Sequence, residues 1–159
     1  IRHAKAEQAG KGMSDIDRPL KQKGEKQAAR LGLWLKASDF HPDLIWSSPA
    51  VRTHMSARII LDYINAPLSS LRVRKKLYLA DASDIFTLIH KASPEIKHLA
   101  LVGHNPGIAD LIDLLSSDKH PEFPPATICT IDFAVSSWEG VVQGSGLTRH
   151  FITPAMLKE

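Results

Sequence analysis

Apolar residues recur along the chain with two periods, and together these periods predict strands that alternate with helices. Residues 4–23 are polar, carry Gly10, Gly12 and Pro19, and predict a loop. Short apolar or β-rich runs predict strands at residues 44–46, 72–74, 99–102 and 127–135. Apolar positions three and four residues apart predict helices over 24–37, 49–64, 84–91 and 108–115. This alternation predicts an α/β fold, a three-layer α/β/α sandwich with a mostly parallel central sheet.

The whole chain is expected to form one domain over residues 1–159. It contains no repeat, low-complexity tract or long linker, and its hydrophobic fraction of 43% and charged fraction of 23% are those of a folded protein. The segment Ile1-Arg2-His3 reads as the end of a strand, so the first strand is expected to be truncated at the N-terminus.

Composition narrows the chemistry that the chain can perform. The single cysteine, Cys129, excludes an internal disulfide framework and a cysteine-based zinc cluster. No apolar run approaches the roughly 20 residues of a membrane helix, so a soluble, cytoplasmic protein is expected. The net charge of +3 suits anionic ligands without specifying one. No His-x-His or His-Glu-x-x-His pattern occurs, and neither a metal nor another cofactor is expected.

Two strand–turn–helix junctions carry the candidate functional residues. His104 follows the strand at 99–102, and Asn105 and Pro106 are suited to the N-cap and first position of the next helix. Exposed N–H groups and the helix dipole make such a position suitable for anions. Ligands of parallel sheets bind at the carboxyl ends of the strands, where these junctions lie.

The second junction repeats this construction. Ser48 is the expected N-cap and Pro49 the first helical residue, which places Arg52 in the first turn. A guanidinium there can bind phosphate oxygens in pairs.

The truncated first strand completes the hypothesis. If it runs parallel to the other two, the sheet edge collects Arg2, His3, Arg52 and His104 in one place. Two arginines and two histidines describe a pocket for a phosphoryl group. Each motif alone is more simply explained by an ordinary loop residue, and their joint occurrence carries the hypothesis.

Several segments together resemble the histidine phosphatase superfamily, and within it the small SixA-type phosphohistidine phosphatases. The matching segments run in the family's order: Arg2-His3-Ala4-Lys5-Ala6, Asp17-Arg18-Pro19-Leu20, Ser47-Ser48-Pro49-Ala50-Val51-Arg52-Thr53 with Ser56-Ala57, Leu77-Tyr78, and Gly103-His104-Asn105-Pro106.

The resemblance implies a phosphatase that acts through a covalent phosphohistidine. By this similarity His3 would attack phosphorus, Arg2 and Arg52 would hold the phosphoryl oxygens, and His104 would complete the pocket. Arg18 resembles a residue that lines the substrate approach. The most favoured substrate is phosphohistidine on a protein, which implies a role in signal transduction.

Two features depart from the family's pattern. The usual Arg-His-Gly is Arg-His-Ala here, so Ala4 needs slightly more room or an ordinary backbone angle. The acidic motif that larger relatives use as proton donor is missing. Asp81 is the best candidate for a proton-donating acid and is placed among the substrate-binding residues. Its alternative role is that of a helix N-cap. A site without an acid favours N–P over O–P bonds, because a leaving imidazole can already carry its proton.

The expected mechanism needs two histidines in different charge states. A neutral His3 attacks, while a protonated His104 and the arginines stabilise the transition state, so the two pKa values should be pushed apart.

Three alternatives remain open at this point. The pocket could serve a small phosphorylated metabolite, or it could bind a phosphoprotein without turnover. A nucleic-acid binder is suggested by the basic run at 72–76, which has no aromatic platform and fits a solvated strand edge or a docking surface for an acidic phosphoprotein. The expected partner is therefore a phosphorylated protein or a small phosphorylated substrate, with neither nucleic acid nor membrane.

Overall fold

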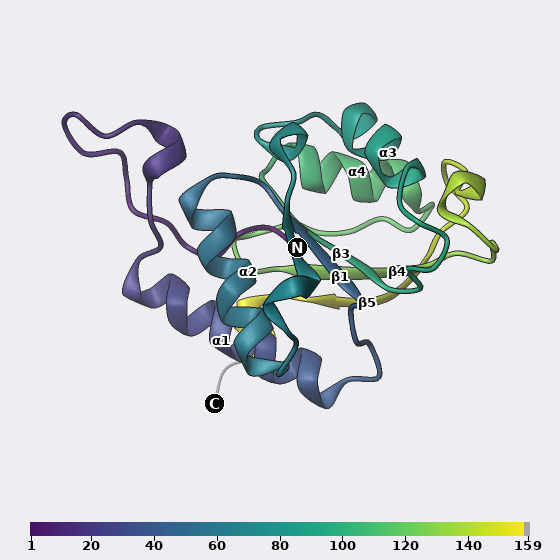
Figure 1. The fold of residues 1–159 in the computed structure, drawn as a ribbon, viewed down its shortest axis with the longest axis horizontal. Coiled ribbons are helices and arrows are strands. Elements are labelled where there is room, and N and C mark those ends of the chain that lie inside the picture. The colour runs from purple at the N-terminus through teal and green to yellow at the C-terminus, as the bar shows by residue number, and fades with distance from the viewer. Residues whose placement is uncertain (158–159) are drawn as a thin grey trace.

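A computed structural model describes residues 1–157 and places helices on both faces of a parallel sheet (Figure 1). The sheet contains β1 (Leu44–Ser47), β2 (Leu71–Val73) and β3 (Leu99–Val102), in the order β2-β1-β3 with every pair parallel. The predicted α/β/α architecture is confirmed.

The helices form two layers, one on each side of the sheet. Helices α1 (Gln22–Ala37) and α2 (Val51–Tyr63) cover one face, and α3 (Ala82–His90) and α4 (Gly107–Leu115) cover the other (Figure 1). Successive side chains of β1 point to opposite faces of the sheet, which explains how both faces are covered. Ile45 packs against α2, whereas Trp46 packs among apolar side chains of α3 and α4. Burial on both faces accounts for the continuous apolar runs seen in the sequence.

Residues 1–3 connect the parallel sheet to a hairpin of two further strands. Arg2 forms a parallel bridge with Gly103, beyond the end of β3, and its N–H donates to the Thr127 carbonyl at 3.1 Å. The hairpin consists of β4 (Ile128–Asp132) and β5 (Leu147–Ile152), which pair antiparallel. The parallel direction expected for the first segment is therefore observed. The strand predicted over 127–135 is shorter than expected, and β5 was not predicted.

Both helices that follow the site junctions start later than predicted. Helix α2 begins at Val51 with Ala50 as its N-cap, so the assignment of Ser48 as N-cap is wrong. Helix α4 begins at Gly107, with Pro106 as its N-cap instead of its first helical residue. A Cβ at position 107 would lie 2.0 Å from the Ala80 carbonyl oxygen, so glycine permits this close approach.

Residues 7–19, here called the strap, form a long hairpin-like excursion that projects from the body (Figure 1). Its base is closed by an antiparallel bridge between Ala6 and Leu20 and by a 2.8 Å hydrogen bond from the Glu7 N–H to the Pro19 carbonyl. The strap contains one short 3-10 turn, η1 (Asp15–Asp17). The prediction of a loop in this segment is thus largely correct, but the sequence gave no indication of which residues the loop contacts.

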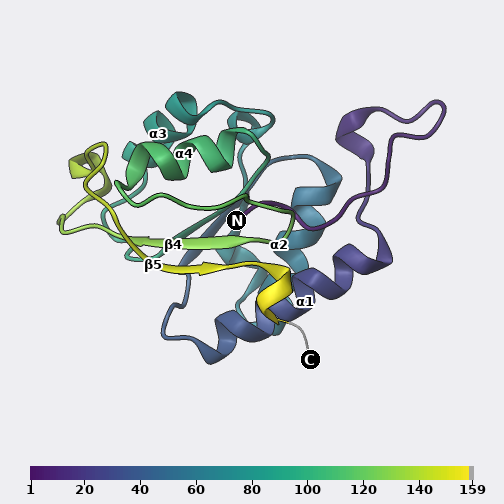
Figure 2. The same ribbon diagram turned by 180° about the vertical axis from the view of Figure 1, so that it is seen from behind.

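The basic run at 72–76 lies on β2, the edge strand of the three-stranded sheet, and on the turn that follows it. The Arg74 guanidinium stacks over the Trp46 ring at 4.5 Å, which gives this arginine a packing role. The C-terminal turn η5 (Pro154–Leu157) rests beside α1 (Figure 2). Within residues 1–157, none of the helices has the length and apolar character needed to cross a membrane.

Candidate active site

The register of the sheet places His3 and His104 side by side. The His3 N–H donates to the Gly103 carbonyl at 3.1 Å, which ties the first segment to the residue before His104. The two imidazole centroids lie 5.4 Å apart with the rings tilted by 60°. Arg52 reaches the pair from the first turn of α2, and its Nη2 lies 3.2 Å from Nδ1 of His104. Three of the four predicted residues thus meet at one strand end.

The tautomer of His3 is fixed by its neighbour. Its Nδ1 lies 2.8 Å from the Ala4 carbonyl oxygen, which can only accept, so Nδ1 carries the proton. In the neutral ring Nε2 then holds a free lone pair. The N–H of Ala4 donates to Ser56 Oγ at 2.9 Å, which fixes the chain immediately after His3. Ala4 is buried without a positive φ angle, so its methyl group is accommodated where relatives carry glycine.

His104 is held between a guanidinium and a hydroxyl. Arginine is a donor only, so Nδ1 of His104 must accept from Arg52, and the proton of the neutral ring is on Nε2. Nε2 donates to Ser48 Oγ at 2.7 Å, and the Tyr78 ring packs edge-on against the imidazole at 5.4 Å. The Ser48 Oγ also accepts from the Ala50 N–H at 3.1 Å, so two donors hold this hydroxyl oxygen.

Both imidazoles have lowered pKa values. Burial is the main cause for each, followed for His3 by the positive charges of Arg52 and Arg2, and for His104 by Arg52 and His3. The pKa is about 4 for His3 and about 3 for His104. The structure thus keeps His3 neutral as expected, but the expectation of a protonated His104 is wrong, because burial and the adjacent Arg52 guanidinium lower the pKa of His104.

These pKa values predict a loss of stability in mild acid. The folded-state values lie below the ordinary value of 6.5, so between pH 6.5 and about 4 the unfolded chain binds protons that the folded chain does not. The free energy of unfolding should therefore fall as the pH is lowered through this window, by roughly 1.4 kcal/mol per pH unit for each histidine. Thermal unfolding at a series of pH values measures it. The His3→Gln variant should show a shallower dependence, and a slope equal to that of the wild type would contradict the assignment.

Arg2 and Arg52 each have a buried hydrogen-bond donor without a partner among residues 1–157. Arg2 donates from Nη1 to the Phe123 carbonyl at 2.9 Å. Nε of Arg2 and Nε of Arg52 are buried without a hydrogen-bond partner in the described part of the chain. Buried donors of this kind normally have an acceptor, and an anion would provide one. By contrast, no group of three or more histidine, cysteine, aspartate or glutamate side chains within residues 1–157 is placed to hold a metal ion.

Arg18 and Asp81 take different positions from the central residues. Arg18 lies at the base of the strap, where Nε donates to the Glu7 carbonyl at 2.7 Å and Nη1 to Asp15 at 2.9 Å. Asp81 is the N-cap of α3, and its Oδ1 accepts from the Asp84 N–H at 2.9 Å. That bond lowers the pKa of Asp81, so its carboxylate is ionised and has no proton to donate. The N-cap alternative is therefore the role that the structure gives it.

Sequence reasoning missed a carboxylate that reaches the site from the strap. Asp15 accepts from Arg52, Arg18 and Tyr78, and the hydrogen bond from Tyr78 is the largest of several causes that lower its pKa. Its only sequence signal is its place three residues before Arg18. Tyr78 was noted within a motif but was given no role.

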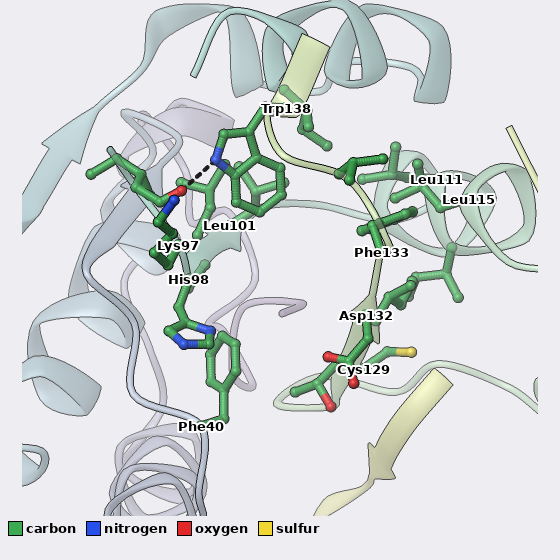
Figure 3. Close-up of a pocket in the computed structure, with 18 of the residues that line it drawn as sticks. Phe40, Lys97, His98, Leu101, Leu111, Leu115, Cys129, Asp132, Phe133 and Trp138 are labelled. Carbon is green, nitrogen blue, oxygen red and sulfur yellow. Dashed lines mark hydrogen bonds between the residues drawn. The ribbon is translucent and has the colours of Figure 1, made fainter. Parts of the chain in front are cut away.

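A cavity with a largely apolar lining lies away from these residues, between β3 and β4 (Figure 3). It has a volume of about 460 Å³ and is bounded by apolar side chains such as Leu101, Leu111 and Phe133, with Trp138 at one side. The Trp138 indole donates to the Ile96 carbonyl at 2.7 Å. None of the residues predicted for catalysis lines it, so this cavity is not the candidate site.

Comparison with known proteins agrees with the geometry. Residues 1–77 match the sequence profile of the histidine phosphatase superfamily (branch 1). The chain is also 31% identical to the uncharacterized protein Rv1276c of Mycobacterium tuberculosis over 117 residues, which are 74% of this chain and 70% of that protein.

Solved structures show the same fold over nearly the whole chain. The protein histidine phosphatase SixA complexed with tungstate has a TM-score of 0.84 at 23% identity, covering 99% of this chain and 97% of that one. A protein of Agrobacterium tumefaciens named as a phosphohistidine phosphatase SixA has a TM-score of 0.80 at 25% identity, covering 97% and 95%. The α-ribazole phosphatase of Shigella flexneri is less similar, with a TM-score of 0.70 at 15% identity, covering 97% and 95%.

The structure is that of an α/β protein whose parallel strands end at a cluster of two imidazoles and the Arg52 guanidinium. The chain belongs to the histidine phosphatase superfamily, and this similarity supports a phosphatase, a hydrolase of phosphoryl groups.

Proposed function

We propose that the chain removes phosphate from phosphohistidine on a protein, with His3 as the nucleophile. The observation that carries the proposal is the hydrogen bond from His3 Nδ1 to the Ala4 carbonyl, because it leaves Nε2 unprotonated. The charges of Arg52 and Arg2 are near enough to lower the pKa of His3, and each guanidinium has a buried Nε without a partner among the residues that the structure describes. This is the arrangement that covalent catalysis at phosphorus needs.

The first step would form a new N–P bond and break the one in the substrate. His3 Nε2 donates its lone pair to phosphorus, and the leaving imidazole keeps the electron pair of the old bond. Arg2 and Arg52 stabilise the charge on the phosphoryl oxygens in the transition state. His104 contributes by holding Arg52 through Nδ1, as its neutral state requires.

The second step would return the enzyme to its starting state. A water oxygen attacks phosphorus, the bond to His3 Nε2 breaks, and orthophosphate leaves while the imidazole recovers its lone pair. Neither step as written calls on a metal ion, and activity is expected to survive treatment with a chelator.

The nature of the leaving group supports a phosphohistidine substrate. An alkoxide needs a proton from a general acid, worth typically 10²–10⁴-fold in rate. The carboxylates considered for this task, Asp15 and Asp81, both have lowered pKa values and are ionised. An imidazole already protonated on its second nitrogen departs without that help.

A small phosphorylated metabolite is the second candidate substrate. The fold shared with the α-ribazole phosphatase of Shigella flexneri favours it, since that protein has the same architecture and a small-molecule substrate by name. An unidentified proton donor would then be required for an oxygen leaving group.

Substrate profiling tests the proposal directly. Hydrolysis of a phosphohistidine peptide and of a sugar phosphate should be compared at equal concentration, with EDTA present in a parallel series. We expect at least about 100-fold preference for the N–P bond, from the missing general acid. A preference for the sugar phosphate would transfer the proposal to the metabolite class. Binding of the phosphopeptide without turnover would identify a phosphoprotein-binding module instead.

A further inference from the structure

Asp15 makes an unusually complete set of contacts for a residue in an exposed strap. Arg52 Nη1 donates to its backbone carbonyl at 2.7 Å and Arg52 Nη2 donates to its Oδ2 at 3.0 Å. Arg18 Nη1 donates to Oδ1 at 2.9 Å, and the Tyr78 hydroxyl donates to Oδ2 at 2.5 Å. One carboxylate therefore joins the strap, the base of the strap, α2 and the turn before α3.

We propose that Asp15 is a positioning residue that orients Arg52 for phosphoryl binding, an inference that rests on the proposed function. Asp15 occupies the end of the guanidinium fork, formed by Nη1 and Nη2. Nη2 also reaches His104 Nδ1, while Nε is buried and has no partner. The contacts of Nη1 and Nη2 thus fix the guanidinium from one end and leave Nε as the donor that an anion can use.

The burial of Arg52 explains why such a clamp is needed. Arg52 is 3% exposed, and a buried guanidinium without a counter-charge is costly. The Asp15 side chain is 45% exposed, so it covers the cation from the solvent side. Tyr78 and Arg18 hold the carboxylate from two further directions, which limits the movement of Asp15 and hence of Arg52.

Simple electrostatics and positioning predict opposite effects of removing this charge. A carboxylate beside an anion site repels anions, so its neutralisation alone should strengthen oxyanion binding. If Asp15 instead aligns the guanidinium, its neutralisation should weaken binding, because misplacement by about 1 Å can cost roughly 100-fold. The sign of the change therefore separates the two roles.

The test uses Asp15→Asn with Asp17→Asn as its matched control. Asp17 lies in the same turn and carries the same charge, and its side chain is bonded to Ser14 Oγ instead of the arginines. Tungstate and inorganic phosphate affinities should be measured by calorimetry, together with kcat and KM for the phosphohistidine peptide.

We expect Asp15→Asn to weaken oxyanion binding and kcat/KM by about 100-fold. Its unfolding temperature should fall below that of Asp17→Asn, because Arg52 loses its counter-charge. Asp15→Glu should restore part of the loss, which a purely structural defect would not allow. Unchanged or tighter tungstate binding by Asp15→Asn would overturn the proposal, and if that variant does not fold, unchanged or tighter binding by Asp15→Ala would do so. If the wild type binds tungstate but hydrolyses nothing, the proposed function fails while the binding comparison still tests Asp15.

Discussion

Replacing His3 with alanine should abolish the transfer of phosphate to the protein and reduce turnover by at least about 1000-fold, because no other unprotonated nitrogen is available at the site. His104 cannot substitute, since its Nδ1 accepts from Arg52 and its Nε2 carries the proton donated to Ser48. Rapid-quench labelling with a phosphohistidine peptide should detect an acid-labile phosphoenzyme in the wild type and none in His3→Ala.

The same variant should still bind phosphate, since the unpartnered Nε donors of Arg2 and Arg52 remain. His54→Ala is the matched control, because His54 lies on α2 within two residues of Arg52 and is no part of the His3 and His104 contacts. We expect it to retain activity within about twofold, as is usual for substitutions outside a catalytic unit. A labelled phosphoenzyme in His3→Ala would show that another group is the nucleophile.

The central sheet was predictable from the sequence because its strands are buried on both faces. The apolar runs at β1 and β3 leave no alternative to burial, and the helices between them have clear apolar stripes. Strand β5 was missed because its exposed and half-buried residues include Thr148, Arg149 and His150, so it lacks a hydrophobic face that marks a strand. Its place depends on pairing with β4 across a long loop, which a local pattern does not encode.

The candidate site likewise contains residues that the sequence predicted and features that it did not. The cluster of His3, His104 and Arg52 follows from strand direction, since parallel strands bring their carboxyl ends to one edge. The charge of His104 was misjudged because it depends on burial and on contact with Arg52, which only the packed structure reveals. Asp15 was missed because it arrives from an aperiodic strap, and its contact with Arg52 spans 37 positions.

Replacing Arg52 with lysine should reduce kcat/KM by about 100- to 1000-fold although the positive charge is kept, an effect comparable to losing an oxyanion donor. The guanidinium bonds Asp15 through two nitrogens and His104 through one of these, and its Nε is left for the substrate. A lysine ammonium is a single point charge and cannot make these contacts in three directions. Steady-state kinetics and tungstate calorimetry measure the loss.

Arg58→Lys is the matched control, because Arg58 lies on the exposed side of the same helix and its substitution should change neither quantity. A double variant then shows whether Asp15 acts through Arg52 or independently of it. If Asp15 acts through Arg52, adding Asp15→Asn to Arg52→Lys should cost far less than the same change in the wild type, since there is no longer a fork to orient. Fully additive losses would mean that Asp15 serves the reaction by a route that does not pass through Arg52.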